Sequence, residues 1–118
     1  MTTPAMHDAA HALFTADGVP VTVMRDSTGF VAQRVVATIV NIGCDIAQQG
    51  IASPEDIDLA VMLGLGYAHG HPLTLGAMTL LTILRNIYSV LGYPYRPSPW
   101  LMRRAPLGLP LTHLEEFR

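Results

Sequence analysis

The sequence has very little cysteine and few charged residues. Cys44 is the only cysteine among 118 residues, so the chain can form no intramolecular disulfide and no zinc site built on several thiolates. Only 14% of the residues are charged and the net charge is −2, with no cluster of basic residues. Because nucleic-acid binding needs a concentrated positive surface, we expect no nucleic-acid partner.

Long apolar runs and a signal sequence are also missing. The N-terminus has no basic stretch followed by an apolar core, so we expect no signal peptide. The apolar stretch from Val35 is broken by Asn41 and Asp45, and residues 73–84 are too few to cross a bilayer. We therefore expect no membrane partner and a cytoplasmic location, with which a single cysteine agrees.

Half of the residues are hydrophobic, which is enough for one compact core. The residue patterns predict an all-α fold, a helical bundle around a long central helix, with one short N-terminal strand. The other elements are expected to pack around residues 25–50. This stretch is predicted to form an extended segment, a tight turn at residues 26–29, and the central helix, which ends at Gly50. Asp26, Ser27 or Thr28 can cap the first amides of this helix.

The central helix is apolar over most of its circumference. At about 100° per residue its polar side chains fall on one narrow stripe. A helix of this kind should be buried against several neighbours. The stripe consists of Arg34, Asn41, Asp45, Gln48 and Gln49.

Local signals predict four further helices. The first covers about residues 5–16 behind a Thr2 or Thr3 cap, and Ser53-Pro54-Glu55-Asp56 gives the clearest helix start of the chain. Pro72 starts a long helix that reaches Leu91, and Ser98-Pro99 starts a short one. The expected core residues are Ile57, Ala60, Val61 and Leu65 in one helix, and Leu73, Leu80, Leu84, Ile87 and Leu91 in the next.

Residues 19–24 alternate valine with other residues, which predicts the short strand. No second strand is predicted to satisfy its backbone groups. We therefore expect the strand to pair with another chain or unit, or to stay extended in water.

Gln33 is the one candidate ligand contact. It lies at the margin of the apolar arc, near Ala37 and Val40, where an amide needs a partner in the fold or on a ligand. A core amide bonded to the backbone is the alternative. No nucleophile with a neighbouring base and no paired carboxylates stand out, so we assign no catalytic, cofactor-binding or metal-binding residue.

Two pairs of histidines are candidate metal ligands. His7 and His11 share a helix face, while His69 and His71 lie in a glycine-rich loop, residues 64–72. No nearby acid or cysteine completes a set for the second pair, and a solvated pair is the default for the first. The loop follows a helix and its glycine spacing is wrong for phosphate binding, so it is interpreted as a helix-to-helix connection.

Four segments together resemble the C-terminal domain of 3-hydroxyacyl-CoA dehydrogenases. Residues 26–34 (DSTGFVAQR) resemble the family's D-T-P-G-F-x-x-N-R, and residues 50–58 (GIASPEDID) match its G-x-A-S/T-x-E-D-I-D. Residues 64–73 look like its G-x-G-Y-P-x-G-P, and residues 95–101 (YRPSPWL) are similar to its R-Y-R-P-S-P-x-L. The closest likeness is to longer bacterial enzymes that carry a second copy of this domain.

The resemblance implies a helical domain like that of 3-hydroxyacyl-CoA and 6-phosphogluconate dehydrogenases. It implies oxidation of a 3-hydroxyacyl-CoA to the 3-ketoacyl-CoA, with hydride passing to NAD, in fatty-acid or aromatic-acid degradation. The family's catalytic His–Glu pair and its dinucleotide-binding glycines belong to an N-terminal Rossmann domain, and nothing in this chain matches them. We therefore expect this chain alone to bind no NAD and to be inactive.

The expected partners follow from the same resemblance: the Rossmann domain, the acyl-CoA substrate and a second copy in a homodimer. Residues 1–24 then correspond to the last helix and strand of a preceding unit, residues 25–104 to the helical domain, and residues 105–118 to an irregular tail. Gln33 stands where the family has an asparagine near the reacting oxygen, which implies substrate binding by Gln33.

The sequence also departs from the family pattern. Thr28 replaces a proline, His71 is inserted into the loop, and the segment after Gly76 lacks the family's aspartate. These departures would suit a duplicated domain that is kept for packing. The alternative function is therefore a non-catalytic helical module for dimerisation or interaction, derived from the same domain.

Overall fold

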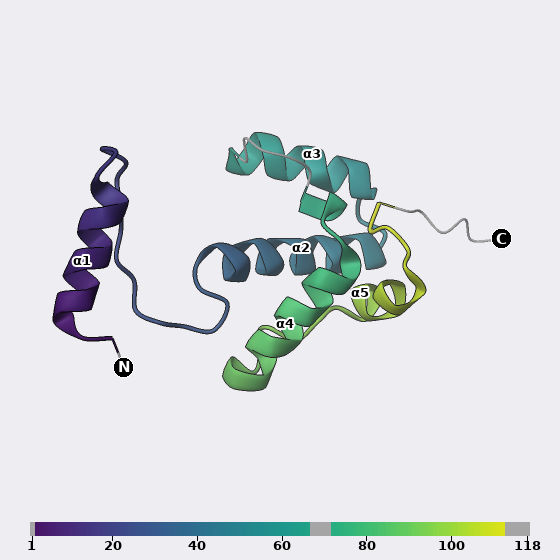
Figure 1. Ribbon diagram of the computed structural model, residues 1–118. Coiled ribbons are helices and arrows are strands. Elements are labelled where there is room, and N and C mark those ends of the chain that lie inside the picture. Colours follow the sequence, from purple (N-terminus) through teal and green to yellow (C-terminus); the bar gives the residue numbers. More distant parts are fainter. Residues whose placement is uncertain (1, 67–71, 113–118) are drawn as a thin grey trace.

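The computed structural model describes residues 2–66 and 72–112, and this part of the chain is all-helical (Figure 1). The predicted all-α fold around a long central helix is confirmed. No helix in the described ranges is long and apolar enough to cross a membrane. The helices are α1 (Pro4–Thr15), α2 (Ala32–Gln48), α3 (Pro54–Leu65), α4 (Ala77–Leu91) and α5 (Pro99–Arg104), with the 3-10 helices η1 (Pro72–Thr74) and η2 (Ala105–Leu107).

Helix α2 lies in the middle of the bundle and packs against α3, η1, α4 and α5 (Figure 1). One hydrophobic core joins these elements. Its buried residues include Ala37, Val40, Cys44, Ile57, Leu73, Leu80, Leu81, Leu84, Trp100, Leu101, Ala105 and Leu111.

The chain leaves α2 and enters α3 as its sequence predicts. Gly50 has φ 67°, the Gly50 N–H bonds to the carbonyl of Ala47, and the Ile51 N–H bonds to that of Ile46. This is the Schellman pattern that a glycine after the last helical residue favours. The Ser53 hydroxyl then accepts from the N–H of Asp56 at 3.2 Å and donates to the Asp56 carboxylate at 2.9 Å.

The predicted helix over residues 72–91 is interrupted in the structure. η1 is followed by Leu75 and Gly76, and the extended ψ of 125° at Gly76 separates it from α4. The carboxylate of Asp58 accepts the N–H of Leu73 at 2.8 Å and so holds η1 against α3. Leu91 was expected in the core but is exposed, because it lies at the far end of α4.

Helix α3 buries a different set of residues from the expected one. Ile57 and Asp58 are buried, while Ala60 and Leu65 are exposed and Val61 is half-buried. The expectation for Ala60 was wrong because α3 turns its Ile57–Asp58 side toward α2 and η1. Asp58 faces the core because its carboxylate binds a backbone amide there.

The short strand predicted over residues 19–24 is absent: this segment has no regular secondary structure. A strand needs a hydrogen-bonding neighbour, and no strand is assigned among residues 2–66 and 72–112 to supply one. The segment connects the rest of the bundle to α1, which stands apart and buries no residue (Figure 1).

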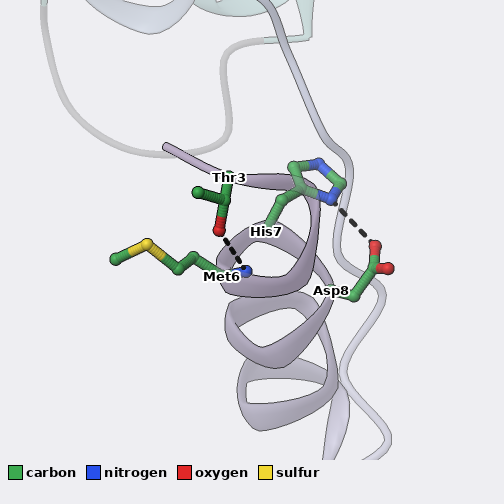
Figure 2. Close-up of polar contacts among 4 residues, drawn as sticks. All are labelled: Thr3, Met6, His7 and Asp8. Carbon is green, nitrogen blue, oxygen red and sulfur yellow. Dashed lines mark hydrogen bonds and ion pairs between the residues drawn. The ribbon is translucent and has the colours of Figure 1, made fainter. Parts of the chain in front are cut away.

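Local polar contacts at the start of α1 match its predicted cap. The Thr3 hydroxyl accepts from the N–H of Met6 at 3.3 Å (Figure 2). Pro4 occupies the first turn of the helix. The large apolar residues Met6, Leu13 and Phe14 of α1 are exposed. Helix α1 therefore forms through its own sequence and not through packing on the bundle.

Helix α2 is buried on one side only. Its core-facing side carries Ala37, Val40 and Cys44, while Val31 and Ile42 on the opposite side are exposed. The expectation that this helix is buried against several neighbours is confirmed, since α3, η1, α4 and α5 all contact it, but one side of it stays exposed in the single chain.

Candidate functional site

The turn before α2 is the centre of the candidate site, because Gln33 follows directly from it. The N–H of Phe30 bonds to the carbonyl of Ser27 at 3.0 Å, and the N–H of Arg34 bonds to that of Gly29 at 3.2 Å. No side chain caps α2, which corrects the predicted capping role of Asp26, Ser27 or Thr28. The backbone of the turn supplies the acceptor instead.

Two consecutive residues of this turn have positive φ, Gly29 at 76° and Phe30 at 46°. Two features favour glycine at position 29. Its φ is positive, and a Cβ there would lie 2.9 Å from Cδ1 of Ile87 on α4. Phe30 is unusual, because a bulky residue seldom adopts this conformation and it costs about 1–2 kcal/mol. The turn is therefore locked against α4 and holds the Phe30 ring in solvent.

Gln33 is exposed on the first turn of α2. The alternative of a core amide is wrong, because the buried side of the helix begins only at Ala37. An exposed amide on a fixed turn can donate to and accept from a ligand. Substrate binding by Gln33 stays a prediction.

Arg34 connects the first turn of α2 to the segment after α4. Its Nε donates to the Tyr95 hydroxyl at 2.9 Å, and its guanidinium carbon lies 5.0 Å from the centre of the Tyr95 ring. The hydrogen bond and the cation–π contact fix the side chain next to Gln33 in the sequence.

Asn41 fastens the same segment two turns further along α2. Its Nδ2 donates to the carbonyl of Arg96 at 2.9 Å, and its Oδ1 accepts from the N–H of Ser98 at 2.7 Å. Asn41 belongs to the polar stripe of α2, but it is only 7% exposed. A signal was present: a proline-rich segment has few amides of its own to pair, so a helix amide facing it becomes the partner.

Two hollows open along the exposed side of α2. The larger, of about 500 Å³, lies between α2 and residues 93–99, and Thr38, Ile42, Asp45 and Tyr93 contribute to its lining. The smaller, of about 150 Å³, lies at the turn and is lined by Met24, Arg25, Ser27, Phe30, Val31, Arg34 and Val35.

Cys44 is fully buried, as its place on the apolar arc predicts. Burial raises the pKa of its thiol to about 12, the neighbouring Asp45 raises it as well, and Arg104 opposes them. The thiol is therefore neutral near pH 7 and is no nucleophile there.

The histidines of α1 lie far from the candidate site (Figure 1). His7 Nδ1 lies 3.2 Å from an Asp8 carboxylate oxygen on the surface of α1 (Figure 2). Within residues 2–66 and 72–112, no three His, Cys, Asp or Glu side chains are close enough together to hold a metal ion. His69 and His71, the second pair weighed, lie outside the described residues.

A dinucleotide site of the Rossmann type needs a strand that leads through a glycine-rich turn into a helix. No strand is assigned in the described ranges. Gly29, the glycine of the turn before α2, instead allows close packing against Ile87. The described residues therefore do not form a dinucleotide site of this type.

Known proteins match most of this chain. A family model described as 3-hydroxyacyl-CoA dehydrogenase, C-terminal domain, matches residues 29–112. The 3-hydroxyadipyl-CoA dehydrogenase of Escherichia coli (strain K12) is 39% identical over 95 residues, which cover 76% of this chain and 20% of that protein.

Two further relatives have similar identities. A probable 3-hydroxybutyryl-CoA dehydrogenase of Deinococcus radiodurans is 37% identical over 71% of this chain and 32% of its own length. Lambda-crystallin of Oryctolagus cuniculus is 40% identical over 86% of this chain and 31% of its own length. The chain thus spans between 20% and 32% of these relatives.

Proposed function

The chain belongs to the 3-hydroxyacyl-CoA dehydrogenase family, as a member of its C-terminal domain, and on this premise we propose that it forms the helical part of such an enzyme. In this proposal the helical domain lines the substrate cleft and mediates dimerisation, and the complete enzyme is NAD-dependent. The reaction is oxidation of a 3-hydroxyacyl-CoA to the 3-ketoacyl-CoA, in fatty-acid or aromatic-acid degradation in the cytoplasm.

One observation carries the proposal: the family match begins at Gly29 and so includes the rigid turn and the exposed Gln33. Two of the relatives are named as dehydrogenases of 3-hydroxyacyl-CoA compounds. The match to only 20% of the Escherichia coli protein is compatible with a long enzyme that carries the domain twice.

The catalytic base and the NAD site belong to a Rossmann domain outside this chain. Residues 1–24 are then the end of a preceding unit, which agrees with an α1 that buries none of its own residues. Residues 25–104 form the helical domain and residues 105–118 follow it, and within this last part Leu111 is buried in the core.

Gln33 is the residue that we propose to contact the acyl-CoA. The turn fixed by Gly29 against Ile87, and Arg34 fixed by Tyr95, hold the first turn of α2 in place. A fixed amide can offer both a donor and an acceptor to a thioester or hydroxyl oxygen without first losing backbone freedom.

Calorimetric titration of the 118-residue chain with 3-hydroxybutyryl-CoA tests this role. Gln33→Ala should weaken binding by about three- to tenfold, which is the loss of about one neutral hydrogen bond. Gln48→Ala is the matched control, because Gln48 is an exposed glutamine at the other end of α2. Equal effects of the two changes, or no heat of binding at all, would contradict a cleft role for Gln33.

A separate assay tests where the chemistry lies. The chain mixed with NAD and 3-hydroxybutyryl-CoA should form no NADH, and turnover by this chain alone would refute the proposed division of labour. The alternative, a non-catalytic interaction module, is favoured by the exposed apolar side of α2. Self-association without any acyl-CoA binding is the result that would select it.

A further inference from the structure

Helix α1 is not held in place by packing. In the part of the chain that the structure describes, it contacts no other helix, and it buries none of its 12 residues (Figure 1). A short helix without packing is marginal in water, because its few hydrogen bonds barely offset the entropy lost in forming the first turn. Contacts among its own side chains, or a ligand that joins them, therefore decide how well α1 is ordered.

Two histidines lie about one turn apart on α1. His7 and His11 are separated by four residues, so their side chains leave the helix on the same face, and both are exposed. Two histidines at this spacing on a helix can bind one metal ion together, as in the H-E-x-x-H arrangement that binds zinc. The sequence of residues 7–11, HDAAH, has this spacing with an aspartate at its second position.

Asp8 orients the first histidine of the pair. His7 Nδ1 lies 3.2 Å from an Asp8 carboxylate oxygen (Figure 2). In the tautomer whose Nδ1 donates this bond, the lone pair of the ring is on Nε2, on the side away from Asp8. A carboxylate that accepts from the other nitrogen of a metal-binding histidine fixes the tautomer and makes the ring a better ligand.

The charges near the pair favour a cation. Residues 2–24 contain the acids Asp8 and Asp17 but no lysine or arginine. Because α1 contacts none of the other described helices, their basic side chains do not lie against the two imidazoles. The positive end of the helix dipole opposes a cation, but its effect is weak at an exposed site in salt.

We propose that His7 and His11 together bind one divalent transition-metal ion, which joins two successive turns of α1 and stabilises this helix. Imidazoles are good ligands for Ni²⁺, Cu²⁺ and Zn²⁺. Water completes the coordination, since within the described ranges no third His, Cys, Asp or Glu is placed to join the pair. The ion stabilises the helical state because only the helix holds both rings at this spacing. The inference does not rest on acyl-CoA binding by Gln33.

Calorimetric titration of the 118-residue chain with Ni²⁺ tests the pair. His7→Ala and His11→Ala should each weaken binding at least about tenfold, because a single imidazole loses the advantage of two linked ligands. His71→Ala is the matched control, since it removes a histidine outside α1 and should leave this affinity unchanged. A chain that binds no Ni²⁺, or one weakened equally by all three changes, would overturn the proposal.

Moving one histidine along the helix tests the spacing while the number of histidines stays the same. In the His11→Ala background, Ala10→His places the second imidazole three residues from His7, on a neighbouring part of the helix surface. Ala12→His places it five residues away, on a different side. The first variant should recover Ni²⁺ binding and the second should not. Equal affinities of the two variants would show that the histidines bind independently and would refute the shared site.

Hydrogen exchange measures the effect of the metal on α1 directly. At a Zn²⁺ concentration ten times the dissociation constant, amide exchange within α1 should slow by up to about tenfold, because the ion binds the helical state preferentially. Exchange in α2 and α4 should not change, since their stability depends on the hydrophobic core. Zn²⁺ that binds without slowing exchange in α1, or that slows it equally in all three helices, would contradict an ion that joins the turns of α1.

Discussion

The carboxylate of Asp58 accepts a hydrogen bond from the backbone N–H of Leu73 at 2.8 Å, at a site where Asp58 is 2% exposed. The two residues are 15 positions apart and belong to α3 and η1. A single buried acid thus fixes the start of the segment that leads into α4.

Asp58→Ala should lower the free energy of unfolding by about 2–3 kcal/mol, because it removes a hydrogen bond to a charged group and leaves a buried amide without its acceptor. Urea denaturation followed by circular dichroism measures this. Glu55→Ala, an exposed acid in the first turn of the same helix, is the control and should change stability by less than about 1 kcal/mol. Equal losses of stability in the two variants would mean that the negative charge of Asp58, and not its hydrogen bond to Leu73, stabilises the fold.

Asn41→Ala should destabilise the fold by about 2 kcal/mol, since the buried N–H of Ser98 and the carbonyl of Arg96 both lose their partner. Thermal and urea unfolding report the change. Gln48→Ala on the same helix should have almost no effect. If Asn41→Ala unfolds at the same urea concentration as the wild type, the amide does not fasten the segment.

Gly29→Ala should lower the free energy of unfolding by more than the strain of its positive φ alone would cause. Both Gly29 and Gly50 have positive φ, but only at Gly29 would a Cβ meet another side chain, Cδ1 of Ile87 at 2.9 Å. We expect a loss of about 1–2 kcal/mol for Gly50→Ala from strain, and a larger loss for Gly29→Ala. Ile87→Val in the Gly29→Ala background should recover part of the difference. Equal losses at the two glycines would exclude the contact with Ile87 as a cause.

Stability should fall as the pH rises from about 9 toward about 12, because of Cys44. Burial raises the pKa of its thiol from the ordinary value of 9.0 to about 12 in the folded chain, so the folded state keeps the proton that the unfolded state releases. The contribution is complete below pH 9 and is lost above it. Urea unfolding at several pH values should show a steeper decline for the wild type than for Cys44→Ala. Parallel curves would contradict the shift.

The end of α2 and the start of α3 could be predicted from sequence, because their causes lie within a few residues. Ser53 with Pro54 starts α3, and Gly50 closes α2, through bonds between near neighbours. The strand at residues 19–24 could not be judged this way. Alternating valines describe a strand only when another strand lies beside them, and that depends on chain far away in sequence.

Two of the buried polar residues, Asn41 and Asp58, also depend on chain far away in sequence. Asn41 and Asp58 were assigned by periodicity to helix surfaces or passed over, because an amide or a carboxylate is usually exposed. Each is buried because a distant segment presents backbone groups to it: residues 96–98 to Asn41, and η1 to Asp58. For the candidate site, the turn and the position of Gln33 followed from the family motif, whereas the Arg34–Tyr95 contact required the fold.

Residues 93–99, which lie beside α2, offer few backbone N–H groups for pairing with a strand of another chain. Pro94, Pro97 and Pro99 have no backbone N–H, and Asn41 occupies the amide of Ser98. A segment with so few free donors cannot serve as an edge for a growing sheet, although it lies open beside an apolar helix face. Residues 93–99 therefore offer few backbone donors with which a strand of another chain could pair.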